Sequence, residues 1–220
     1  IKRSRIRNLT INYVNLNNCK SNIKKFDKSR LLIVTKNQSQ SDIQELINSG
    51  YKVFGENRVQ EAKLKYNSLN NSEDIKLHLI GPLQTNKVKE ALMLFDTIES
   101  IDRKKLVDEI FKVTNKIPKI KTNNYFIQIN IGSEDQKFGV DKSKVLELYE
   151  YSISKNLIIE GFMCIPPNTS SPEKYFQEMN LIRDSIDKSL KLSMGMSNDY
   201  LLALKNNSNI VRIGSLIFND

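Results

Sequence analysis

Short apolar segments alternate with amphipathic segments along the chain, and this alternation restricts the possible folds more than any other feature. We predict strands at residues 31–35, 52–54, 76–80, 96–99, 125–131, 157–165, 191–194 and 210–213. Apolar residues between them recur at helical spacing, which predicts helices ending at Gly50 and over 57–69, 86–95, 102–114, 141–153, 173–190 and 198–206. This α/β alternation without a Gly/Pro/Ser-rich linker favours a single (β/α)8 barrel (TIM barrel) domain over residues 1–220 rather than two half-size domains.

One further helix is expected before the first strand. Ile6, Leu9, Tyr13 and Leu16 stand at helical spacing within residues 4–26. The barrel should therefore carry an extra N-terminal helix.

Composition excludes several classes of protein. Cys19, Cys164 and His78 are the only cysteines and histidine, too few for a disulfide framework or a Cys/His zinc site, so we expect no metal. The chain lacks both a signal-peptide pattern and the roughly eighteen-residue apolar run of a membrane span, which predicts a cytoplasmic protein that binds no membrane. Its formal net charge of +9 would suit nucleic acid, but lysines and acids are interleaved, as in residues 87–90. We therefore favour a solvated lysine-rich surface and expect no nucleic-acid binding.

Lys36 follows the apolar run of the first predicted strand, at the edge where α/β barrels carry their chemistry. If apolar neighbours half enclose it, desolvation lowers its pKa and provides a nucleophilic amine near neutral pH. The alternative is that Lys36 simply ends a strand in solvent.

The loops after the seventh and eighth strands have the residues of a phosphate site, which barrels frequently build there. Ser197 is expected to open a helix and donate its hydroxyl to an anion, although an ordinary N-cap is the alternative. Gly214 and Ser215 can add backbone N–H donors. Five glycines follow predicted strands, where glycine permits positive φ and close approach of a ligand: Gly55, Gly81, Gly132, Gly195 and Gly214.

Arg212 interrupts the apolar run of the eighth strand and needs a partner if buried. An arginine beside a ring nitrogen would keep that nitrogen unprotonated. Strand eight neighbours strand one in a barrel, which brings Lys36 close to Arg212. An amine, an anion site and an arginine around one barrel mouth suit a phosphorylated aldehyde held as a Schiff base, as pyridoxal 5′-phosphate (PLP) is.

Several longer segments carry a family resemblance. They are Val-Thr-Lys at 34–36, FGENRVQE at 54–61, HLIGPLQTNK at 78–87, QINI at 128–131, GFM at 161–163, SMGMSND at 193–199 and VRIGSLIF at 211–218. The chain thereby resembles the pyridoxal phosphate homeostasis proteins, whose barrel is similar to the N-terminal domain of alanine racemase. One departure is residues 206–209, Asn-Asn-Ser-Asn, where the family usually has a glycine, and we expect it to affect local stability.

The resemblance implies a role for each candidate residue. Lys36 would form the internal aldimine, Arg212 would face the pyridine nitrogen, and Asn57 would lie beside the cofactor. The phosphate would be held by Ser197, Gly214 and Ser215.

The resemblance also implies a cytoplasmic PLP-binding protein that balances vitamin B6 and amino-acid pools without established catalysis. Its partners would be PLP and PLP-dependent apo-enzymes, and we expect a monomer. The alternative is a weak PLP-dependent amino-acid racemase with Lys36 as one of two acid/base groups. In the racemases the other group is a tyrosine from a separate β domain, for which a chain ending at Asp220 has no room. Nucleic-acid binding ranks last.

Overall fold

The eight strands form a closed parallel barrel in chain order in a computed structural model, which describes residues 10–70, 74–134, 138–169 and 171–218. The ring closes where β1 (Arg30–Val34) pairs with β8 (Ile210–Ile213), with Leu32 opposite Arg212. The remaining strands are β2 (Val53–Glu56), β3 (Lys76–Leu79), β4 (Thr97–Ile101), β5 (Asn124–Ile129), β6 (Ile159–Cys164) and β7 (Lys191–Ser193). The barrel prediction is confirmed.

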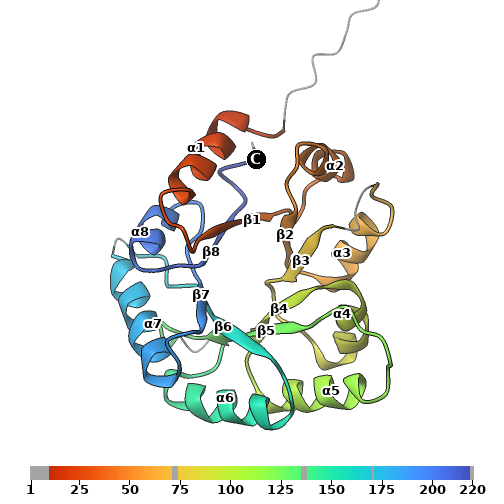
Figure 1. The fold of residues 1–220 in the computed structure, drawn as a ribbon, viewed down its shortest axis with the longest axis vertical. Coiled ribbons are helices and arrows are strands. Elements are labelled where there is room, and N and C mark those ends of the chain that lie inside the picture. Colours follow the sequence, from red (N-terminus) through yellow and green to blue (C-terminus); the bar gives the residue numbers. More distant parts are fainter. Residues whose placement is uncertain (1–9, 71–73, 135–137, 170, 219–220) are drawn as a thin grey trace, which may run out of the picture.

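Helices surround the ring of strands (Figure 1). Each of β1 to β7 is followed by one helix: α2 (Gln40–Asn48), α3 (Val59–Tyr66), α4 (Val88–Leu94), α5 (Lys104–Thr114), α6 (Val145–Ser154), α7 (Glu173–Ile186) and α8 (Tyr200–Lys205). Short 3-10 turns, η1 (Thr85–Lys87) and η2 (Lys142–Lys144), precede α4 and α6.

The helix before the barrel, α1 (Tyr13–Ile23), stands between α8 and α2 (Figure 1). It thus fills the place of the helix that would follow β8. The N–H of Asn12 donates to the carbonyl of Ile217 at 2.7 Å, which ties α1 to the segment after β8. The predicted helix is therefore present from Tyr13 onward, whereas Ile6 and Leu9 lie outside the described residues.

Side-chain alternation along the strands divides the apolar residues into two groups. One set fills the barrel interior: Leu32, Val34, Ile80, Phe126, Met163 and Ile210. The other set, which includes Ile33 and Phe54, packs against the helices in a larger core. Strands buried on both faces explain the continuous apolar runs in the sequence. Among the residues that the structure describes, no helix combines the length and apolarity needed to cross a bilayer.

Candidate functional site

Lys36 lies at the C-terminal end of the barrel, two residues beyond the last residue of β1. The strand ladder continues through Thr35, whose N–H donates to the carbonyl of Gly55 at 3.0 Å. Since Leu32 and Val34 point into the barrel, the alternation puts Lys36 on the interior side, at the mouth. Lys36 is exposed, so of the two alternatives left open by the sequence the structure shows the lysine that ends a strand in solvent, not the half-enclosed one.

Asn57 follows β2 directly and is half-buried beside the loop after β3. A Cβ added at Gly81 would lie only 2.2 Å from the carbonyl oxygen of Asn57 and 2.8 Å from its Cα. Glycine at position 81 is therefore needed for two strand-end loops to touch. The helix predicted from residue 57 begins at Val59 instead, which leaves Asn57 in the loop.

The loops after β7 and β8 meet through one hydroxyl. The N–H of Leu216 donates to Oγ of Ser197 at 3.3 Å, and the loop after β7 turns at Gly195, whose φ is +93°. Among the described residues, the backbone N–H groups of Ser197 and Ser215 have no protein acceptor. Two loops thus present N–H donors and a hydroxyl at the same end of the barrel as Lys36.

One expectation about these loops is wrong. Ser197 does not open a helix, because α8 begins at Tyr200 and the residue before the helix is Asp199. Of the five strand-end glycines, only Gly195 adopts the positive φ that glycine permits. Gly214 instead allows close packing across the barrel seam, because its Cβ would lie 3.2 Å from Cβ of Val34.

Arg212 belongs to a buried polar network in the barrel interior. Arg212 is 3% exposed, and its guanidinium donates to Oγ of Ser193 at 2.9 Å and to the carbonyl oxygen of Cys164 at 2.7 Å. Ser193 donates in turn to Glu99 at 2.5 Å, and Glu99 lies 2.6 Å from Nδ1 of His78. The network therefore joins β3, β4, β6, β7 and β8 across the barrel.

Glu99 carries the negative charge of this network. Its burial is complete and by itself raises the pKa, but hydrogen bonds from His78 and Ser193 and the charge of Arg212 bring the pKa below its ordinary value. The carboxylate therefore compensates the buried guanidinium. Sequence reasoning missed Glu99, His78 and Ser193 as site residues, although each is a polar residue in a strand.

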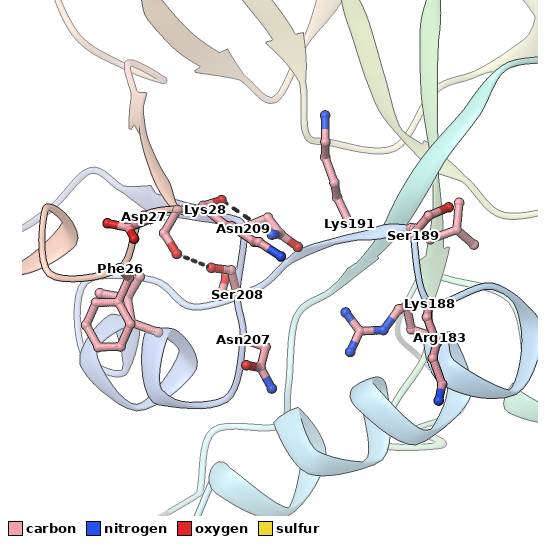
Figure 2. Close-up of a pocket in the computed structure, with 13 residues that line it drawn as sticks. Phe26, Asp27, Lys28, Arg183, Lys188, Ser189, Lys191, Asn207, Ser208 and Asn209 are labelled. Atoms are coloured by element: carbon pink, nitrogen blue, oxygen red, sulfur yellow. Dashed lines mark hydrogen bonds between the residues drawn. The ribbon is translucent and has the colours of Figure 1, made fainter.

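One pocket lies at the opposite end of the barrel (Figure 2). It has a volume of about 590 Å³ and is lined by segments that precede β1, β7 and β8. Figure 2 shows the guanidinium of Arg183 pointing into it, while the amine of Lys191 points away. Arg183 is already bonded to Asp184 and Asn180, and Lys191 to Glu160. The pocket is thus remote from Lys36, and two of its charged side chains, Arg183 and Lys191, already have partners.

Metal-ligating residues do not gather in the part of the chain that the structure describes. No group of three or more His, Cys, Asp or Glu side chains could hold an ion there. Both cysteines are free and buried.

Comparison with known proteins gives consistent results. A family model described as "Alanine racemase, N-terminal domain" matches residues 13–220. A pyridoxal phosphate homeostasis protein of Aquifex aeolicus (strain VF5) is 39% identical over 201 residues, which cover 87% of each chain. The protein of that name from Helicobacter pylori (strain J99) is 35% identical over 198 residues, again 87% of each.

Two solved structures are similar in fold. PipY of Synechococcus elongatus PCC7942 with PLP bound has a TM-score of 0.83 and 27% identity, covering 94% of this chain and 99% of that chain. Alanine racemase from Bartonella henselae, with covalently bound pyridoxal phosphate, has a TM-score of 0.71 at 14% identity. The latter match covers 94% of this chain and 59% of the racemase and indicates likeness of fold alone.

Proposed function

Because the chain belongs to the family of pyridoxal phosphate homeostasis proteins, we propose that it binds pyridoxal 5′-phosphate at the barrel mouth through Lys36 and serves PLP homeostasis. The observation that carries the proposal is the position of Lys36 beside the paired loops after β7 and β8. Relatives of the chain bear this name, and PipY has been solved with PLP bound.

The phosphate end of the ligand fits the two loops. Ser197 offers a hydroxyl and a backbone N–H, and Ser215 offers a second N–H without a protein acceptor among the described residues. Gly214 lies between β8 and Ser215, where the absence of a side chain keeps the backbone accessible. Hydrogen bonds to a charged phosphate contribute about 1.5–3 kcal/mol each. We assign Ser197, Gly214 and Ser215 to the phosphate.

The pyridine ring of PLP would lie next to Arg212, a positive group that cannot accept a proton. Arg212 keeps its charge at every accessible pH and has only donors, so a ring nitrogen next to it would stay unprotonated. Its position is fixed by Ser193 and by the carbonyl of Cys164. We assign Arg212 to the ring nitrogen and Asn57 to the side of the ring.

When bound, PLP supplies an aldehyde carbon that an amine can attack and a ring that can withdraw electrons. Lys36 provides the amine, which is exposed at the mouth.

We further propose that the chain is a carrier or regulator and not an efficient enzyme. Racemisation needs a second acid/base group across from Lys36. Tyr66 contacts Thr35, the residue before Lys36, because its hydroxyl is bonded to Oγ1 of Thr35 at 2.8 Å. Burial holds the pKa of Tyr66 well above the ordinary value. Tyr200 turns its hydroxyl toward Asn22 on α1. An arginine in place of a carboxylate at the ring nitrogen also favours binding without turnover.

The direct test is an absorbance titration of the purified chain with PLP. A band near the violet edge of the visible spectrum should appear and should be fixed to Lys36 by borohydride. Lys36→Ala should abolish both, whereas Lys104→Ala, which removes an exposed lysine at the start of α5, should change neither. A parent chain that stays colourless and traps no adduct would contradict PLP binding.

A second measurement separates the carrier from the racemase. The loaded protein is incubated with single-enantiomer amino acids, and the loss of optical activity is compared with that caused by free PLP. Rates no greater than with free PLP support the carrier. Transfer to PLP-dependent apo-enzymes, a monomeric state and a cytoplasmic location stay predictions.

A further inference from the structure

A buried lysine of α3, Lys65, contacts the turn that carries Lys36. Nζ of Lys65 donates to the carbonyl oxygen of Thr35 at 2.6 Å, one residue before Lys36. It also contacts Oε1 of Glu56 at 3.0 Å and Oε1 of Glu61 at 2.6 Å. Only 10% of the Lys65 side chain is exposed, although lysine is rarely buried without a specific partner.

The residue after Lys36 is held from the same helix. The N–H of Asn37 donates to Oε1 of Glu61 at 2.6 Å, and Asn37 has a φ of +62°, in the left-handed region that non-glycine residues seldom adopt. Such a conformation persists where surrounding contacts over-determine it. Glu61 and Lys65 are four residues apart and form an ion pair on one face of α3, so the bonds to Thr35 and Asn37 are linked.

The side chain of Thr35 completes this arrangement. Its Oγ1 donates to Oε1 of Glu56 at 2.7 Å and accepts from the hydroxyl of Tyr66 at 2.8 Å. Both partners are buried, and the other oxygen of Glu56, Oε2, has no hydrogen-bond partner among the described atoms. Lys65 is thus the cation that compensates a buried carboxylate and fixes the backbone beside Lys36 with the same ammonium group.

We propose that Lys65 and Glu61 are positioning residues, which hold the turn at residues 35–37 so that the amine of Lys36 is presented at the barrel mouth. The inference rests on the proposed function for its consequence, adduct formation with PLP. Its structural part, the restraint of the turn, does not need PLP. Neither residue touches the mouth itself, so both act through the backbone on either side of Lys36.

The test compares three variants by two measurements. Glu61→Ala removes the acceptor of the Asn37 N–H, and Lys65→Met removes the ammonium group while keeping the length of the side chain. Lys63→Met is the matched control, because Lys63 lies on the same helix with 57% of its side chain exposed. Amide exchange of Asn37 is followed by NMR without PLP, and the rate of adduct formation at Lys36 is followed by absorbance.

We expect exchange of Asn37 to be at least about tenfold faster in Glu61→Ala and adduct formation at least about tenfold slower in both site variants, as loss of hydrogen bonds to charged groups predicts. Lys63→Met should match the parent chain in both. If Lys65→Met does not fold, Glu61→Ala carries the test, since Glu61 is partly exposed. Folded site variants with the parent's exchange and adduct rates would overturn the proposal. A parent chain that forms no adduct would refute the proposed function instead, and the exchange rates would still decide the restraint.

Discussion

Arg212 and Glu99 are joined through a single hydroxyl: Ser193 Oγ accepts from the guanidinium at 2.9 Å and donates to the carboxylate at 2.5 Å. All three side chains are buried in the barrel interior. An isolated guanidinium would be costly there, so the carboxylate two bonds away makes its burial possible. The residue assigned to the ring nitrogen therefore depends on a residue from the opposite part of the barrel.

Glu99→Gln should destabilise the chain by about 3–5 kcal/mol at pH 7, the usual cost of removing one charge from a buried pair. Because the pKa of Glu99 is lowered in the folded state, its carboxylate stabilises the fold above the unfolded pKa of about 4.5. That contribution is lost as the pH falls through the folded pKa. Urea denaturation should therefore give a difference between parent and variant that shrinks below about pH 4.5. Glu147→Gln, at an exposed position, is the control, and a difference independent of pH would contradict the charge argument.

Ser197→Ala should weaken PLP binding far more than binding of pyridoxal, which lacks the phosphate. Loss of one hydrogen bond to a charged phosphate predicts an increase in Kd of about 10- to 100-fold for PLP. The substitution also removes the acceptor of the Leu216 N–H. Ser189→Ala, at the opposite end of the barrel, should leave both affinities unchanged. Equal losses for PLP and pyridoxal would place Ser197 away from the phosphate.

Gly81→Ala should lower both stability and PLP affinity. The added methyl group would lie 2.2 Å from the carbonyl oxygen of Asn57, so one of the two loops must move. We expect a loss of about 1–3 kcal/mol in the free energy of unfolding, as for other overpacked sites. Gly50→Ala is the matched control, because its φ of +87° strains the new residue while its Cβ meets nothing within 4 Å. That variant should lose stability without losing affinity.

Asn207 occupies a left-handed position, with a φ of +64°, in the segment where the family usually has a glycine. Asparagine tolerates this conformation better than most residues. Asn207→Ala should therefore lower the free energy of unfolding by about 1 kcal/mol, whereas Asn207→Gly should change it less. Thermal unfolding measures both variants. If alanine and glycine were equivalent here, backbone conformation would not explain the choice of asparagine.

Strand positions could be predicted because strands buried on both faces appear in the sequence as continuous apolar runs. The eighth strand, predicted at residues 210–213, is observed as Ile210–Ile213. Helix ends were harder: the helix predicted from residue 198 begins at Tyr200, since the turn at residues 197–199 has the same polar composition as a helix start. Local composition does not distinguish a turn from a first helical turn.

The contacts that fix the site could not be predicted from one segment at a time. His78, Glu99, Ser193 and Arg212 come from four strands, and only closure of the barrel brings them together. Lys65 and Lys63 likewise look alike in the sequence of α3, but one is buried against Thr35 and the other faces solvent. Polar residues at alternate positions in otherwise apolar strands are the sequence signal that could have predicted the network of His78, Glu99, Ser193 and Arg212.

The six apolar side chains inside the barrel fill its interior, so the site at Lys36 is reached from one end only. A molecule that reaches Lys36 comes over the rim and departs over the same rim, because the interior gives no passage to the far end. Binding and release therefore use the same opening of the barrel. A macromolecule that covered this opening would therefore block binding and release together.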